Sequence, residues 1–376
     1  MAAKHETGDT VAQQNDPAST ATDYTAFEGT APVGERQRFD ADALARWLAE
    51  HVDGFAGPLT VEQFKGGQSN PTFKLVTPTR SYVMRAKPGP AAKLLPSAHA
   101  IEREYRVMAA LADTDVPVAR MHALCDDESV IGRAFYVMAF VEGRVLWDPA
   151  LPGMSPDARA AHYDEMNRVI AALHTVDPAS VGLSDYGKPG NYFARQIGRW
   201  SKQYLASETE PIDAMHRLIE WLPQHMPADE GRPVSIVHGD YRLDNLIFHP
   251  TEPRVLAVLD WELSTLGDPL ADFAYHCMTW HVDPQQFRGI AGLDWQALGI
   301  PDEASYVARY CERTGLSIPG DWNVYLAYNM FRIAAILQGI MKRVVDGTAS
   351  SAQALDAGRR ARPMAEQAWK YAQKVR

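Results

Sequence analysis

The spacing of hydrophobic residues changes twice along the chain. Up to about residue 36 there is little periodicity, so we expect a mobile tail that buries little apolar surface. From about 57 to 145, short apolar stretches separated by turn-forming residues predict strands in LTVEQF, PTFKLVT, SYVMRAK and FYVMAFV. One helix is predicted before this part, from about Asp40, and a single helix from about Ala98 to Ala112 interrupts the strands. The pattern indicates a small antiparallel sheet with helical cover.

Beyond Pro149 the apolar spacing is mostly helical. It predicts helices over 155–175, 190–207, 211–226, 268–281, 302–314 and 321–346. The exception is a β insert, in which a strand at Ile236 and Val237 precedes a hairpin of Leu246–Phe248 with Val255–Leu259. A β-rich front third is therefore followed by a helical remainder, which predicts an α+β fold.

Composition narrows the classes of partner. The chain has 37 Lys and Arg against 47 Asp and Glu, and this net charge of −10 argues against broad binding to nucleic acid or anionic membranes. Its three cysteines are widely separated and lack zinc-site spacing. We see no signal peptide, and the apolar stretches are too short or are interrupted by Asn329 and Arg332. We expect a cytoplasmic protein, either a monomer or a homodimer.

The strongest chemical signal is VHGDYRLDN followed by VLDWE. A strand delivers Asp240 to a loop, and Asn245 follows five positions later. The predicted hairpin returns Asp260 to the side of Asn245. One amide oxygen and one carboxylate at a common point form a hard-oxygen site suited to Mg²⁺. Asp240 is left free to orient or deprotonate a hydroxyl group, so the spacing predicts phosphoryl transfer.

These motifs resemble those of the aminoglycoside phosphotransferase family, which shares the two-lobed protein-kinase-like fold. HGDYRLDN matches the family's catalytic loop, and LDWE takes the place of the kinase DFG motif. The resemblance implies ATP and Mg²⁺ as cofactors, with Asp240 as catalytic base, Asn245 and Asp260 as metal ligands, and His238 as support for the loop. It implies a nucleotide-binding lobe over 37–142 and a helical lobe over 143–376.

The loop KGGQSN joins two predicted strands. Its residues Gly66, Gly67, Gln68 and Ser69 offer backbone N–H groups that are able to cover phosphates. A plain hairpin turn explains the same pattern. The loop also departs from the protein-kinase G-x-G-x-x-G spacing.

The next strand supplies a cation for the nucleotide phosphates. By resemblance this is Arg85, although Lys87 points the same way along the strand and stays open as an alternative. The following helix supplies a carboxylate partner. Helical periodicity places Glu104 within the apolar face, where a charge needs an ion pair, and Glu102 on the polar face as a solvated charge. We therefore predict a pair between Arg85 and Glu104.

The segment FYVMAFVEG is predicted to join the lobes. By resemblance Met138 lines an adenine pocket, and the backbone from Phe140 to Glu142 pairs with the base; a simple core strand is the alternative. Further on, Asp268 is expected to cap a helix. Asp272 is expected to brace the catalytic loop through Arg242 or His238.

The sequence says less about the chemical identity of the phosphoryl acceptor. No APE-type activation segment follows the metal motif, so we expect a small-molecule hydroxyl acceptor. The basic residues Arg195, Arg199, Lys202, Arg332 and Lys342 form either a solvated face or an anion-binding wall. YVMRAKPGP and LDWELSTLGDPLAD are similar to the kinase domain fused to some acyl-CoA dehydrogenases. That similarity implies a hydroxyacyl-CoA or another anionic metabolite as acceptor, in preference to an antibiotic.

Two other functions remain open from the sequence. One is a nucleotide-binding pseudokinase, a regulator without turnover, which the intact Asp240, Asn245 and Asp260 disfavour. The other is a metal-dependent hydrolase that uses His238, Asp240, Asp260 and His276. Its histidines lack the spacing that zinc sites usually have.

Overall fold

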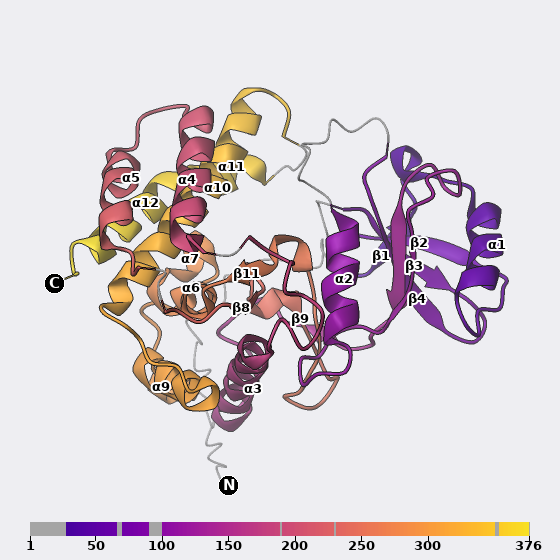
Figure 1. Ribbon diagram of the computed structural model, residues 1–376, viewed down its shortest axis with the longest axis horizontal. Helices are drawn as coiled ribbons and strands as arrows, with labels where there is room; N and C mark the ends of the chain where they lie inside the picture. The colour runs from indigo at the N-terminus through magenta and orange to yellow at the C-terminus, as the bar shows by residue number, and fades with distance from the viewer. Residues whose placement is uncertain are drawn as a thin grey trace, which may run out of the picture.

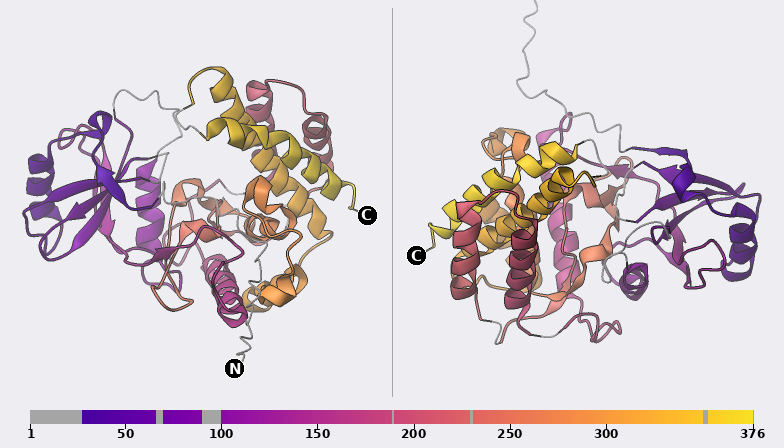
Figure 2. Two further views of the ribbon diagram at one scale, coloured as in Figure 1. Left: turned by 180° about the vertical axis from the view of Figure 1, so that it is seen from behind. Right: turned by 90° about the horizontal axis from the view of Figure 1, so that it is seen from above.

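The protein has an α+β fold of two lobes that lie side by side (Figure 1). The computed structural model describes residues 28–65, 70–89, 100–188, 190–228, 231–349 and 353–375. The first lobe is built on one antiparallel sheet, and the second is mostly helical. In both views of Figure 2, helices α5 (Asp213–His225) and α12 (Ala361–Ala372) lie at the end of the molecule that is remote from the sheet.

The sheet of the first lobe has six strands in the order β1-β2-β3-β4-β6-β5. The strands are β1 (Thr30–Pro32), β2 (Thr60–Phe64), β3 (Thr72–Val76), β4 (Ser81–Ala86), β5 (Met121–Cys125) and β6 (Phe135–Ala139). Strand β1 lies within the predicted tail, so that prediction is wrong for residues 30–32. These residues form an edge strand on β2. Residues 1–27 lie outside the described part of the chain.

Alternation along β4 separates two cores. Tyr82 and Met84 belong to the cluster that includes Leu44 and Leu48 of helix α1 (Ala41–His51), which begins directly after Asp40, close to the predicted start. Val83 belongs to the other cluster, with residues of helix α2 (Ile101–Leu111). Since side chains alternate between the faces of a strand, Arg85 lies on the α2 side. Helix α2 lies between the sheet and the second lobe (Figure 1), so Arg85 faces the junction of the lobes.

The second lobe packs around one long helix, α10 (Trp322–Val345), which contacts α4, α6, α11 and α12. The other helices are α3 (Pro156–Thr175), α4 (Tyr192–Ser207), α6 (Pro269–Cys277), α7 (Pro284–Phe287), α8 (Trp295–Leu298), α9 (Glu303–Thr314) and α11 (Ala354–Arg359). The predicted helix over 268–281 is shorter, because it tightens into a 3₁₀ turn, η5 (Met278–His281). Among the described residues, α10 alone is long and apolar enough to cross a membrane, but 83% of its apolar window is buried inside the protein.

The β insert lies beside the helices as predicted. Strand β8 (Ser235–Val237) pairs with β11 (Thr265–Gly267), and β9 (Leu246–Phe248) pairs with β10 (Val255–Val258). A two-residue strand, β7 (Arg144–Val145), joins β9 directly after the connection between the lobes. The insert therefore brings the loop after β8 and the turn after β10 to the junction of the lobes (Figure 1).

Candidate active site

The loop after β8 is held by a buried carboxylate. Asp272 Oδ2 and Oδ1 accept hydrogen bonds from the backbone N–H groups of His238, at 2.7 Å, and Gly239, at 2.9 Å. Burial opposes the charge of Asp272, but His174 and the His238 amide together lower its pKa. Gly239 has a φ of +82°, and a Cβ there would lie 2.8 Å from the Leu263 carbonyl oxygen. The predicted brace is confirmed, and it acts on the backbone of His238 rather than on Arg242.

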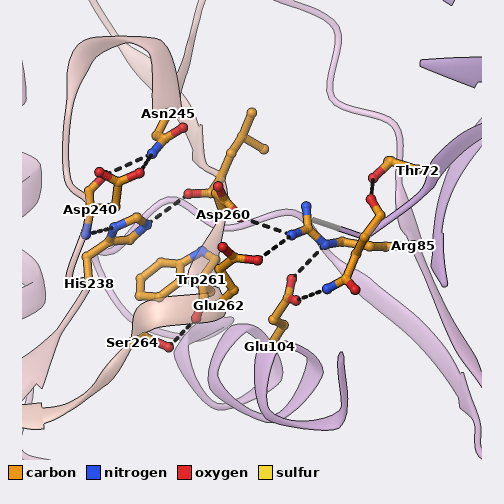
Figure 3. Close-up of polar contacts among 12 residues, drawn as sticks. Thr72, Arg85, Glu104, His238, Asp240, Asn245, Asp260, Trp261, Glu262 and Ser264 are labelled. Carbon is orange, nitrogen blue, oxygen red and sulfur yellow. Dashed lines mark hydrogen bonds and ion pairs between the residues drawn. The ribbon is translucent and has the colours of Figure 1, made fainter. Parts of the chain in front are cut away.

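His238 supports the loop from within. Its Nε2 lies 2.8 Å from the carbonyl oxygen of Leu259, and its Nδ1 accepts a hydrogen bond from the Asp240 amide at 3.2 Å. This pattern assigns a neutral imidazole with its proton on Nε2. The ring is fully buried. His238 thus links the loop that carries Asp240 to the strand that leads to Asp260 (Figure 3).

Asp240, Asn245 and Asp260 converge as the sequence predicted (Figure 3). Asn245 Nδ2 donates to the carbonyl oxygen of Asp240 at 2.8 Å and to its Oδ2 at 3.0 Å. The Leu259 amide donates to the Asn245 carbonyl oxygen at 2.8 Å, which fixes Asp260 beside it. Asp260 has a φ of +64°, an uncommon conformation for a non-glycine residue. Such backbone strain often occurs at functional sites.

The Asp240 carboxylate is held on both oxygens, rather than left free. The Tyr275 hydroxyl donates to Oδ1, and Arg242 Nε lies 3.5 Å from Oδ2. Burial, together with the nearby Asp240 charge, raises the pKa of Tyr275, so the phenol stays protonated and remains a donor. Sequence reasoning missed Tyr275, because in the run PLADFAYHC it has the pattern of a core aromatic residue.

Arg85 lies opposite, surrounded by three carboxylates (Figure 3). Its Nε lies 3.0 Å from Glu104 Oε2, and its Nη2 lies 3.0 Å from Asp260 Oδ1 and 3.6 Å from Glu262 Oε2. The predicted pair with Glu104 is confirmed. Burial opposes the charge of Arg85, but these carboxylates outweigh it and raise its pKa. Glu262 was not predicted; its position follows from the turn at Asp260.

Glu104 is almost fully buried and has neutral partners as well as Arg85. Asn70 Nδ2 donates to its Oε1 at 3.0 Å, and the Tyr136 hydroxyl donates to its Oε2 at 3.1 Å. Burial raises the pKa of Glu104, and Arg85 offsets part of this effect. Glu102 was predicted to be only a solvated charge, but it pairs with Lys87. Lys87 therefore lies beyond the end of β4 with a partner of its own.

The other residues predicted to contact the nucleotide lie in different environments, and some of them lie outside the described part of the chain. Gly66, Gly67, Gln68 and Ser69 lie outside the described residues. Met138 is buried on β6 next to Val83 of β4. Phe140 and Glu142 follow β6 in the connection between the lobes; the Phe140 ring lies under Lys74, and Glu142 is exposed.

The basic residues of the second lobe do not form one wall. Arg199 and Lys202 are exposed, while Arg195 donates to the Lys188 carbonyl oxygen. Arg332 is buried and donates to the Gly239 carbonyl oxygen. Lys342 pairs with Asp346. The solvated-face interpretation therefore suits the exposed pair on α4, and Arg332 instead supports the loop that carries Asp240.

The hydrolase alternative finds no support in the described part of the chain. His276 is buried against the Tyr306 hydroxyl, and burial lowers its pKa to about 4. No group of three or more His, Cys, Asp or Glu side chains is arranged to hold a metal among the residues described. His238 and His276 instead make hydrogen bonds within the buried part of the lobe.

Comparison with known families agrees with this geometry. A model of the phosphotransferase enzyme family matches residues 60–322 of the chain. A protein from Ralstonia eutropha that carries the provisional name aminoglycoside phosphotransferase has a crystal structure with 72% sequence identity and a TM-score of 0.84. The similarity covers 90% of this chain and 100% of that one.

Two further relatives give the breadth of the similarity. Mouse acyl-CoA dehydrogenase family member 10 is 47% identical over 93% of this chain, but the match spans only 33% of that protein's length. A thermostable mutant of aminoglycoside phosphotransferase APH(4)-Ia, solved with AMP-PNP and hygromycin B, has 17% identity and a TM-score of 0.57. That similarity covers 88% of this chain and 99% of the other, and at this identity it concerns the fold alone.

Proposed function

The chain belongs to the phosphotransferase enzyme family, and on that premise we propose that it transfers the γ-phosphoryl group of ATP to a hydroxyl group of a small molecule. The observation that carries the proposal is the convergence of Asp240, Asn245 and Asp260, with Arg85 beside them at the junction of the lobes. Phosphoryl transfer depends mainly on positioning and on stabilisation of charge, and these four residues supply both.

Asn245 and Asp260 fit the Mg²⁺ ion that such a reaction uses. The amide nitrogen of Asn245 is engaged by Asp240, so its oxygen is the atom left for a metal. The Asp260 side chain is 34% exposed, so a second hard oxygen is accessible beside it. When bound, Mg²⁺ supplies charge screening at the β- and γ-phosphates.

Asp240 is proposed as the catalytic base. It takes the proton of the acceptor hydroxyl while the new bond forms from that oxygen to the γ-phosphorus. The bond from the γ-phosphorus to the bridging oxygen breaks, and ADP leaves with that oxygen. Tyr275 and Asn245 hold the carboxylate in place for this transfer. Arg85, oriented by Glu104, binds the nucleotide phosphates.

The adenine is proposed to lie against Met138 and the backbone from Phe140 to Glu142, with the loop from Gly66 to Ser69 over the phosphates.

For the acceptor we favour a hydroxyacyl-CoA or another anionic metabolite over an antibiotic. The support is the 47% identity to part of a mammalian acyl-CoA dehydrogenase family member. The sequence identity to the antibiotic-bound relative is far lower, at 17%.

The experiment is consumption of ATP with Mg²⁺ over a panel of hydroxyacyl-CoAs, aminoglycosides, amino alcohols and sugars. Asp240→Asn keeps the shape of the side chain but removes the base, so we expect kcat to fall about 10²- to 10⁴-fold with ATP affinity retained. Asp157→Asn, which alters an exposed carboxylate in the first turn of α3, is the control and keeps full activity. Full activity in Asp240→Asn contradicts the assignment, and ATP binding without transfer to any acceptor favours the regulator.

A further inference from the structure

A cavity lies directly beside the catalytic loop. It has a volume of about 550 Å³, part of it open to solvent, and is formed by α3, the loop around Arg242 and the segment from α6 to α7. Most of its wall is apolar or aromatic, contributed by Trp147, Tyr163, Met166, Met278, Val282 and Phe287. Ligand sites are commonly concave and lined in this way by apolar and aromatic side chains.

The cavity reaches the proposed base through two of its own wall residues. Tyr275 and Arg242 both line it. Tyr275 donates its hydroxyl hydrogen to Asp240 Oδ1, and Arg242 Nε lies 3.5 Å from Asp240 Oδ2. The cavity and Asp240 are therefore separated by no more than the side chains of Tyr275 and Arg242. An acceptor whose hydroxyl group contacts Asp240 is able to extend its remainder into the cavity.

The charged groups at the cavity pair with one another or with Asp240. Asp244 pairs with Arg288 and, at 3.2 Å, with Arg242 Nη2. Arg242 in turn lies against Asp240, which is not part of the wall, so the wall itself carries two guanidinium groups and one carboxylate. Arg288 also lies over the ring of Trp147, with its Cζ 5.2 Å from the ring centroid. Each of these charged groups already has a partner of opposite charge, so the apolar wall is the larger surface that is left to recognise a ligand.

We propose that this cavity binds the hydrocarbon part of the acceptor. This proposal rests on the proposed function of the protein as a hydroxyl phosphotransferase. The acceptor class is then an alcohol with an aliphatic or aromatic portion that extends away from the reacting hydroxyl. Transfer of that portion from water to the apolar wall contributes binding free energy roughly in proportion to the area buried. A sugar that carries ammonium groups would have to lose its hydration there without compensating partners.

The test uses straight-chain primary alcohols from 1-butanol to 1-octanol as probes of the whole protein. Their binding is measured by ligand-observed NMR, which needs no turnover. Each added methylene is expected to strengthen binding about fourfold until the cavity is filled, after which affinity levels off. Affinity that does not depend on chain length overturns the proposal.

Two variants change the size of the cavity in opposite directions. Thr279 and Phe287 both line it and are half-buried. Thr279→Phe is expected to move the plateau to shorter alcohols, and Phe287→Ala to longer ones, with the binding of Mg²⁺–AMP-PNP retained as a measure of correct folding. A plateau that stays in place in both folded variants overturns the proposal.

The result separates this subsite from the proposed function. Chain-length-dependent binding with no phosphoryl transfer to any acceptor supports the cavity and contradicts the phosphotransferase assignment. Phosphoryl transfer to a purely polar sugar, with no binding of the alcohols, supports the phosphotransferase assignment and contradicts the hydrocarbon subsite.

Discussion

Glu104 carries a buried charge on which the orientation of Arg85 depends. It is 1% exposed and pairs with Arg85 at 3.0 Å. We predict that Glu104→Gln leaves the buried Arg85 short of one carboxylate and lowers the free energy of unfolding by about 1–3 kcal/mol. Because Arg85 then also loses its orientation, the KM for ATP should rise by at least about tenfold. Denaturant unfolding and steady-state kinetics measure the two effects.

Glu102 provides a matched control on the same helix. It pairs with Lys87, but its side chain is 39% exposed, and exposed pairs contribute little to stability. Glu102→Gln is therefore expected to leave both stability and the KM for ATP nearly unchanged. Equal effects of the two substitutions would mean that the position of Glu104 in the apolar face has no special role.

Helical periodicity was enough to distinguish Glu104 from Glu102, because the spacing of apolar residues along a helix predicts which of its faces is buried. The contacts of Tyr275 and Asn70 could not be found in this way. Tyr275 meets Asp240 from a different helix, and Asn70 meets Glu104 across the junction of the sheet and α2. Such contacts depend on how the elements pack, and no local pattern records that.

At the scale of elements, the connection between the lobes passes close to β9 at a glycine, Gly143. A Cβ at Gly143 would lie 2.4 Å from Ile247 Cγ2 and equally close to the Phe248 carbonyl oxygen. We predict that Gly143→Ala pushes the connection away from β9 and costs about 1–3 kcal/mol of stability, as overpacking does. Since the connection leads out of the proposed adenine site, the affinity for ATP should fall as well. Thermal unfolding and nucleotide titration provide the measurements.

Gly198 is the corresponding control in an open position. It lies within α4 and a Cβ there meets no atom within 4 Å. Gly198→Ala should therefore stabilise the protein slightly, by about 0.5–1 kcal/mol, because alanine loses less backbone entropy in a helix. A loss of stability at Gly198 similar to that at Gly143 would contradict the close-approach explanation.

Elements with strong apolar periodicity were predicted well, whereas strands β1, β5, β7 and β11 were not predicted. The hairpin of β9 and β10 and the helices α3 and α10 follow their apolar spacing closely. Strands β1 and β7 have three and two residues, too few to show alternation, and they exist because a neighbouring strand pairs with them. Helix α12 was also missed, and it is held by packing against α10.

At the scale of the whole molecule, the lobes are joined by polar contacts around the proposed nucleotide site. Arg85 of the sheet reaches Asp260 in the second lobe. Arg103 of α2 donates to the carbonyl oxygens of Tyr186, at 2.8 Å, and Ser264, at 3.3 Å. A nucleotide bound beside Arg85 therefore touches residues of both lobes, and its binding should stabilise the two together.

Binding of Mg²⁺–AMP-PNP should consequently raise the stability of the whole chain as one unit. At one hundred times its Kd the ligand contributes about 2.7 kcal/mol, provided that it binds only the folded state. Removal of the metal with EDTA, or the substitution Asp260→Asn, should reduce this gain, because the β- and γ-phosphates then face the carboxylates of this site without screening. Differential scanning calorimetry measures the shift in a single transition. A gain that is unchanged by EDTA would contradict the metal role of Asp260, whereas two separate transitions with only one shifted would show that the nucleotide binds one lobe alone.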